Sequence, residues 1–260
     1  MKKLDWRNKE EWLSSIPKYA GDIIDDEFLV KIKWDNHDDV SRLLDGNIVK
    51  SFKDAFNKYY SHAKAFHACR PADVSTYYEK GLLGQDKENI EAQFREIFKD
   101  VDDCLIEKAI LDLEDRGSDE KGRIFFICDD QVFIERYGHY LIQGSEYIMS
   151  MSASLSELNG SIDYKYRLRD VGIPTIFEVD IPLDKIPQTQ INELVKIIIA
   201  SWASKRLSPE SAYNEEMSFV LHSDLSPNNI IGHSHPKKIK DPHNSFLWYY
   251  PKVHTCKMCR

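Results

Sequence analysis

The spacing of apolar residues predicts helices along much of the chain. In three long segments apolar side chains recur every three or four residues, a period that places them on one face of a helix. The second segment contains the polar pair Asp102–Asp103, where we expect a break. A shorter helix is expected near the amino terminus, closed by Pro17. The apolar positions of the long segments are Ile48, Phe52, Phe56, Tyr59 and Tyr60; Ile90, Phe94, Ile97, Phe98, Val101, Leu105, Ile106, Ile110 and Leu113; and Ile191, Leu194, Val195, Ile198 and Trp202.

Other segments have patterns typical of strands. Residues 28–34 alternate apolar and polar side chains, which suits a half-exposed strand. Continuous apolar runs predict buried strands at 63–69 and 123–128. A further strand is expected at 217–222, followed by a turn and a new strand from Ile230. Together these segments predict an α+β fold.

The first buried strand delivers His67 and Arg70 to its carboxyl end. Pro71 prevents the strand from continuing, and Asp73 can cap a short helix that Gly81 ends. One interpretation is a core strand whose polar residues are satisfied internally. The other is that the pair grips a polar ligand, because an arginine can bind phosphate through two parallel hydrogen bonds.

Composition limits the classes of protein to consider. The 260 residues are 42% apolar and 12% aromatic, which is enough for a sizeable core. No apolar run reaches the roughly 18 residues of a membrane span, and the amino terminus lacks a signal-peptide core. Five cysteines without a framework spacing favour a reducing cytoplasm. The net charge of −8 argues against broad nonspecific nucleic-acid binding, although a local basic groove stays compatible with it.

The strand and helix around His67 carry a recognisable motif. The residues Phe-His-Ala-Cys-Arg and, further on, Tyr-Tyr-Glu-Lys-Gly-Leu-Leu resemble the opening motif of the ADP-ribosyltransferase superfamily. The resemblance implies an ADP-ribosyltransferase-like split β-sandwich at residues 63–260, after a mainly helical appendage at 1–62. It also implies that NAD binds with His67 on a ribose hydroxyl, the Ala68 amide near the nicotinamide carboxamide, and Arg70 on the pyrophosphate.

A second segment is similar to the next motif of that family, a strand followed by a helix that ends in tyrosine. Two aromatic rings there enclose the nicotinamide, and stacking suits a flat, electron-poor ring. The resemblance assigns these places to Phe126, with Phe125 as the alternative, and to Tyr137. We also assign Tyr140 to the expected cleft, near the polar triplet Gly-Ser-Glu that ends at Glu146.

Residues 213–236 resemble the family's last motif. Their residue pattern is similar to that of the DarT-type nucleic-acid ADP-ribosyltransferases. A glutamate at the start of that strand stabilises the positive charge that develops on the ribose. Ser218 occupies this position here, and Glu216 lies two residues earlier on the same strand face. We therefore expect Glu216 to be the catalytic carboxylate, with Glu146 second and Glu178 as a further alternative.

The resemblance implies transfer of ADP-ribose from NAD to a macromolecule, either nucleic acid or protein. Small transferases of this kind are frequently cytoplasmic toxins or phage-defence effectors, so an antitoxin is a possible partner. Two alternatives stay open: a non-catalytic NAD or nucleotide sensor, and a zinc-stabilised interaction protein.

The carboxyl terminus is rich in histidine and cysteine. Cys256 and Cys259 have the spacing of a zinc-ligand pair, but a structural zinc site needs four ligands, usually as two pairs. Because only this pair has such spacing, we expect no metal and interpret it as a flexible dithiol. The nearby His233 and His235 suggest either a phosphate contact or the close of a strand.

Overall fold

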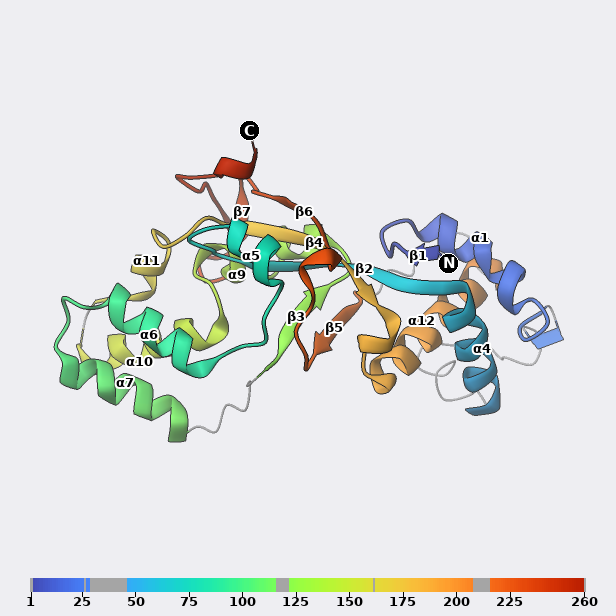
Figure 1. Cartoon of the computed structure of the whole chain (residues 1–260), viewed down its shortest axis with the longest axis horizontal. Coiled ribbons are helices and arrows are strands. Elements are labelled where there is room, and N and C mark those ends of the chain that lie inside the picture. Colours follow the sequence, from blue (N-terminus) through green and yellow to red (C-terminus); the bar gives the residue numbers. More distant parts are fainter. Residues whose placement is uncertain are drawn as a thin grey trace. The chain divides into compact units, whose positions relative to one another are not determined.

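The computed structural model shows an α+β protein (Figure 1). It describes residues 2–25, 27–28, 46–115, 122–160, 162–207 and 216–259. Contacts divide the chain into two compact units, and each combines three separate stretches of sequence. Unit 1 consists of Met1–Ala65, Ile127–Asp129 and Asp180–Val220, and unit 2 of Phe66–Phe126, Asp130–Val179 and Leu221–Arg260.

Unit 1 is built on three helices that pack against one another: α1 (Lys9–Ala20), α4 (Gly46–Tyr59) and α12 (Gln188–Leu207). The predicted apolar faces of α4 and α12 are confirmed, since their apolar residues line the core. The prediction that Pro17 closes the first helix is wrong, because α1 continues to Ala20. Pro17 is exposed while Ile16 and Ala20 are buried, so packing holds the last turn together.

A six-stranded, mostly antiparallel sheet has the order β5-β3-β2-β4-β6, with β1 paired in parallel to β2. The strands predicted near residues 63, 123, 217 and 230 are confirmed, and α4 runs directly into β2. The strand predicted at 28–34 lies, beyond Phe28, outside the described residues. Four strands, β2 to β5, each run from one unit into the other. The strands are β1 (Lys2–Leu4), β2 (Tyr60–Cys69), β3 (Ile124–Ile127), β4 (Thr175–Pro182), β5 (Ser218–Leu221) and β6 (Ile230–Ser234).

Unit 2 has its own helical core, in which α6 (Lys87–Ile97) and α7 (Asp103–Asp115) pack on α10 (Glu146–Leu158). The helix predicted from 89 onward is broken before Asp103, as expected. The remaining elements of unit 2 are short: α5 (Ser75–Lys80), α8 (Asp130–Glu135), α9 (His139–Ile142), α11 (Lys165–Leu168), the hairpin β7 (Ile239–Asp241) and β8 (Leu247–Tyr249), and the 3-10 helices η2 (Pro227–Asn229) and η3 (Lys257–Cys259); η1 (Leu183–Lys185) belongs to unit 1.

The expected domain boundary can be compared with the two observed units. The expected boundary at residue 62 falls inside β2, close to the first break between the units at Ala65. Unit 1 is larger than the expected appendage, because it also takes in α12 and part of β5. In the part of the chain that the structure describes, no helix has both the length and the apolar run needed to cross a membrane.

Candidate functional site

The motif histidine, His67, lies on β2 and is held by the neighbouring strand. Its Nδ1 atom is 2.9 Å from the carbonyl oxygen of Phe125 on β3, and its ring centroid is 5.7 Å from that of Phe126. Burial lowers the pKa of His67, and the hydrogen bond to Phe125 only partly opposes this shift. The imidazole is therefore fixed in orientation and is neutral at pH 7.

Arg70 follows β2 and is enclosed by backbone carbonyl groups. Its Nε donates to the Val171 oxygen at 2.7 Å, and Nη1 donates to that of Leu141 at 2.6 Å. Its Nη2 donates to the oxygens of Arg169 at 2.7 Å and Gly172 at 3.1 Å. Burial lowers the pKa of Arg70 to about 10, so the side chain stays charged at neutral pH. In this structure the guanidinium connects the end of β2 to α9 and to the segment that follows α11, and it also borders a cavity.

That cavity, of about 490 Å³, lies in unit 2 at the carboxyl end of β2. Its size falls within the range of small-molecule sites in proteins. The lining includes Cys69 and Arg70 from the motif strand, Tyr77 from α5, and Gln143 and Ser145 from the segment before α10. The Oε1 atom of Gln143 is buried and has no hydrogen-bond partner among the described residues. A buried amide oxygen without a hydrogen-bond partner lowers the stability of the fold, so a hydrogen bond from a donor would be favourable for this atom.

The aromatic residues expected around nicotinamide lie in different surroundings. Phe126 has no exposed surface, whereas Tyr137 is 37% exposed. The rings that stack are those of Phe125 and Tyr140, whose centroids are 6.0 Å apart with planes inclined by 28°. Phe125, the alternative at the strand position, thus packs on Tyr140, and its carbonyl oxygen is hydrogen-bonded to Nδ1 of His67.

Glu146 is the first residue of α10, and Ser145 is the N-cap of that helix. The polar Gly-Ser-Glu triplet is therefore a helix start, in which the Ser145 hydroxyl accepts from the backbone N–H of Ile148. The hydroxyl of Tyr140 donates to Oε1 of Glu146 at 2.8 Å, and Nε2 of His139 is 3.6 Å from the same atom. His139 and, to a smaller degree, Tyr140 hold the pKa of Glu146 below its usual value, so this carboxylate is ionised.

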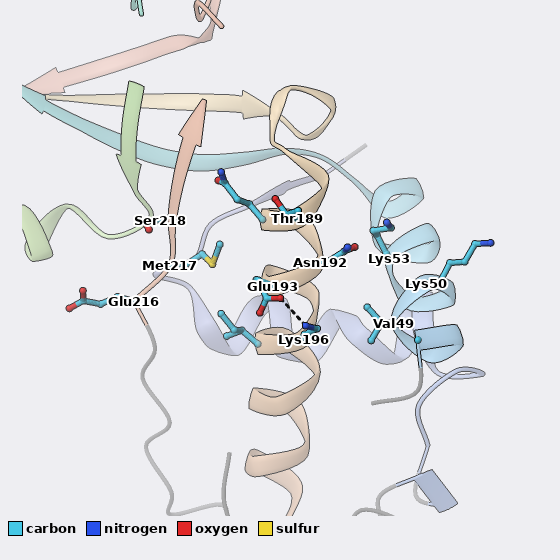
Figure 2. Close-up of a pocket in the computed structure, with 13 residues that line it drawn as sticks. Val49, Lys50, Lys53, Thr189, Asn192, Glu193, Lys196, Glu216, Met217 and Ser218 are labelled. Carbon is cyan, nitrogen blue, oxygen red and sulfur yellow. Dashed lines mark hydrogen bonds and ion pairs between the residues drawn. The ribbon is translucent and has the colours of Figure 1, made fainter. Parts of the chain in front are cut away.

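Glu216, the expected catalytic carboxylate, belongs to unit 1, where it borders another cavity of about 880 Å³ (Figure 2). The walls of this cavity come from α4, α12 and the start of β5, and they include Lys50, Lys53 and Lys196. Figure 2 shows the Glu216 carboxylate pointing away from α12, on which Lys196 pairs with Glu193.

Glu178, the further alternative, lies on β4 in unit 2. It is half-buried and stands opposite Gly232 of β6 in the strand register. Neither Glu178 nor Glu146 lines the cavity at the end of β2, whose carboxylates are Asp86 and Asp224.

The structure also forms a cluster that the sequence analysis missed. His233 and His235 meet Cys256 and Cys259 so closely that one possible metal-ligand atom from each lies within 4.8 Å of the others. The expectation of no metal rested on the lack of a second ligand pair, and the two histidines supply one. The sequence signal was their i, i+2 spacing at the end of a strand, which places both on one face.

Comparisons with models of protein families, with curated proteins and with solved structures found no match to this chain. The inferences below therefore depend on the residues and geometry of this chain.

Proposed function

We propose that this protein is an NAD-dependent ADP-ribosyltransferase that modifies a macromolecule, with NAD bound at the carboxyl end of β2. The observation that carries the proposal is the cavity of about 490 Å³ at this position. Motif residues Cys69, Arg70 and Tyr77 line it together with Gln143, whose buried Oε1 atom has no hydrogen-bond partner among the described residues. The nicotinamide carboxamide and the ribose hydroxyls both offer hydrogen-bond donors.

A series of contacts in unit 2 leads from the motif strand to a carboxylate. His67 is hydrogen-bonded to the carbonyl oxygen of Phe125, and the Phe125 ring stacks on Tyr140. The Tyr140 hydroxyl in turn donates a hydrogen bond to Glu146. We therefore place Glu146 ahead of Glu216 as the candidate for the carboxylate that stabilises positive charge on the ribose. An ionised carboxylate at that carbon would lower the barrier to cleavage of the nicotinamide–ribose bond.

The test is NAD turnover by the full chain and by Glu146→Gln. This substitution keeps the shape and removes the charge, so we expect NAD to bind with similar affinity while turnover falls at least about 100-fold. Glu157→Gln is the matched control, because Glu157 is an exposed glutamate on the same helix. Glu216→Gln is measured in parallel, and a loss confined to it would move the catalytic role to Glu216.

A second candidate is a sensor that binds NAD or another nucleotide without cleaving it. The observation that favours it is the lining of the cavity, where the carboxylates are Asp86 and Asp224. Both already accept backbone N–H groups, Asp86 from Glu88 and Asp224 from Gly84. Calorimetric binding of NAD by the unaltered chain, without turnover, would support the sensor. Absence of binding would overturn both candidates.

A further inference from the structure

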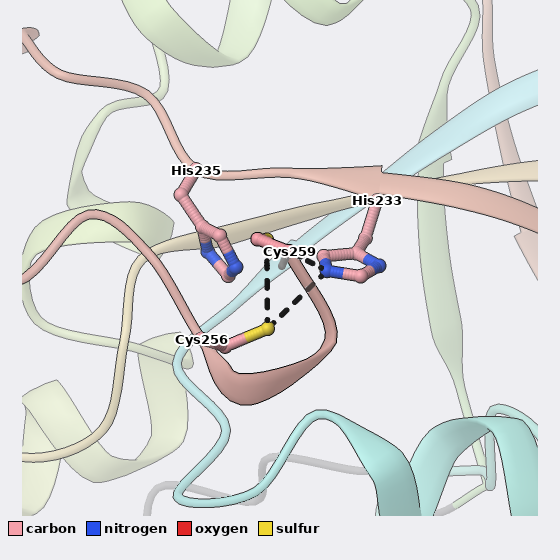
Figure 3. A group of neighbouring side chains, drawn as sticks. All are labelled: His233, His235, Cys256 and Cys259. Atoms are coloured by element: carbon pink, nitrogen blue, oxygen red, sulfur yellow. Dashed lines mark hydrogen bonds between the residues drawn. The ribbon is translucent and has the colours of Figure 1, made fainter.

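We propose that His233, His235, Cys256 and Cys259 form a zinc(II) site that fastens the carboxyl-terminal segment to β6. His233 lies within β6 and His235 directly after it, while Cys256 precedes the single turn of η3 and Cys259 is its last residue. Figure 3 shows the four side chains, which come from two distant parts of the sequence, converging on one point. The proposal does not depend on the function proposed above.

The distances between the donor atoms are those that a tetrahedral zinc ion requires. The two Sγ atoms are 3.6 Å apart, and Nε2 of His233 is 3.4 Å from each. With Zn–S bonds of about 2.3 Å and Zn–N bonds of about 2.0 Å, a tetrahedron separates its sulfurs by about 3.8 Å and sulfur from nitrogen by about 3.5 Å. A zinc ion therefore fits without rearrangement of these three side chains.

The outer nitrogen of each histidine has a partner that fixes the ring. Nδ1 of His235 is 2.9 Å from the carbonyl oxygen of Pro174, and Nδ1 of His233 is 2.8 Å from the Tyr78 hydroxyl. If Nδ1 carries the proton, as the carbonyl contact requires for His235, Nε2 presents its lone pair. Metal-binding histidines characteristically have an outer hydrogen bond of this kind.

The inner nitrogen of His235 gives independent support. Its Nε2 atom is buried and has no hydrogen-bond partner in the described part of the chain. A buried polar atom left in this state is costly, and a metal bond would satisfy it. The unpartnered nitrogen belongs to the same group as the two thiols and His233, so it points to a ligand at their centre.

The donor set favours zinc in a structural role. Two thiolates and two imidazoles match the borderline-soft character of zinc, and four protein ligands leave no position open for substrate. A disulfide is the competing state for the cysteines, but their 3.6 Å separation far exceeds an S–S bond of about 2.05 Å, and both thiols are free. Zinc would bind by displacing one proton from each thiol, with no change of oxidation state.

The site would hold a segment that has few other restraints. Among residues 250–259 the only helix or strand is the single turn η3, and most of the side chains are exposed. Through Tyr78 the site also contacts α5, the helix whose Tyr77 lines the cavity at the end of β2. Zinc would thus secure both the tail and the neighbouring motif helix.

The first test uses the unaltered full chain, purified under reducing conditions without chelator. We expect one zinc per chain by elemental analysis. Cobalt(II) replacing it should give the visible bands of a tetrahedral site and the near-ultraviolet absorption of two thiolate bonds. A reduced chain that neither contains zinc nor takes up zinc or cobalt would overturn the proposal, as would an octahedral cobalt spectrum.

The second test assigns the ligands. Cys256→Ser and His235→Ala should each lower zinc retention at least tenfold. Cys104→Ser, at an exposed free thiol on α7, and His254→Ala, at an exposed histidine within the tail, should retain it. Loss of zinc in His254→Ala with retention in His235→Ala would refute the ligand set. Circular dichroism of each variant separates loss of a ligand from loss of folding.

Discussion

At the scale of single residues, the guanidinium of Arg70 shows how a motif side chain can serve the fold. It donates four hydrogen bonds to carbonyl oxygens of α9 and of the segment that follows α11. One of them belongs to Gly172, whose φ of +66° and close approach to the Arg70 backbone exclude a side chain there, since a Cβ would come within 2.3 Å of the Arg70 oxygen. The pyrophosphate role expected for Arg70 would require some of these hydrogen bonds to be exchanged for ligand contacts.

We predict that Arg70→Met lowers the free energy of unfolding by roughly 3–5 kcal/mol. Hydrogen bonds from a charged group are worth about 1.5–3 kcal/mol each, but they are not additive, and the freed carbonyl groups can recover some water. Urea unfolding measures the change, with Arg123→Met at an exposed arginine as control. Equal stability of Arg70→Met and Arg123→Met would show that the four hydrogen bonds contribute little, leaving Arg70 available for a ligand.

His67 gives a pH dependence whose sign follows from its environment. Burial lowers the pKa of His67 in the folded chain. When the pH falls below the ordinary histidine pKa of about 6.5, His67 therefore becomes protonated in the unfolded chain but stays neutral in the folded chain. Stability should therefore fall as pH drops from about 7 toward 5, by up to about 1.4 kcal/mol per pH unit for this one group. His67→Gln should flatten the dependence and His222→Gln, at an exposed histidine, should leave it unchanged. The opposite slope, or an unchanged slope in His67→Gln, would contradict this account.

At the scale of elements, local patterns in the sequence predict the helices of unit 1 and the strands β2, β3, β5 and β6, but not the strands β1, β4, β7 and β8 or the helix α10. The predicted features depend on residues that are neighbours in the sequence. They include the apolar period of α4 and α12, the break between α6 and α7, and the strand β2. The prediction that Pro17 ends the first helix is wrong because the cost of a proline within a helix is local, whereas the burial of Ile16 and Ala20 that outweighs it comes from the packing of unit 1.

The candidate site was harder to predict because it depends on contacts between distant segments. The pairing of His233 and His235 with Cys256 and Cys259 arises only when the tail folds back on β6. Whether Phe125 or Phe126 packs on Tyr140 depends on which face of β3 each occupies, and a continuous apolar run does not reveal this. The polarity of the Gly-Ser-Glu triplet suggests a cleft, but a serine before a helical apolar pattern is also a typical N-cap.

The N-cap can be tested separately from any catalytic role. Ser145→Ala removes the side-chain acceptor for the Ile148 N–H, so we expect the free energy of unfolding to fall by about 1 kcal/mol. Ser150→Ala, at an exposed position inside the same helix, should be neutral or slightly stabilising, because alanine favours helix interiors. Thermal unfolding of both variants gives the comparison. Equal effects of the two substitutions would argue against a capping role for Ser145.

At the scale of the whole molecule, the division into units indicates which truncated forms of the chain can fold. Unit 1 joins the amino-terminal residues to α12, a helix that the expected boundary at residue 62 assigns to the second domain. The described α12 packs on both α1 and α4, and its buried residues include Ile191, Leu194 and Ile198. An apolar helix face that loses such partners is exposed to water, and exposed faces of this kind promote aggregation.

We therefore predict that the truncated chain 63–260 does not fold into a stable monomer. Removing residues 1–62 deletes α1 and α4, which uncovers the apolar face of α12, and it deletes β1, the partner of β2. Size-exclusion chromatography and urea unfolding should show aggregation or a transition much weaker than that of the full chain. Separate expression of residues 1–62 and their addition to 63–260 should restore part of the stability, because the missing surface is then supplied in trans. A soluble, cooperatively unfolding 63–260 monomer as stable as the full chain would instead establish residues 1–62 as a dispensable appendage.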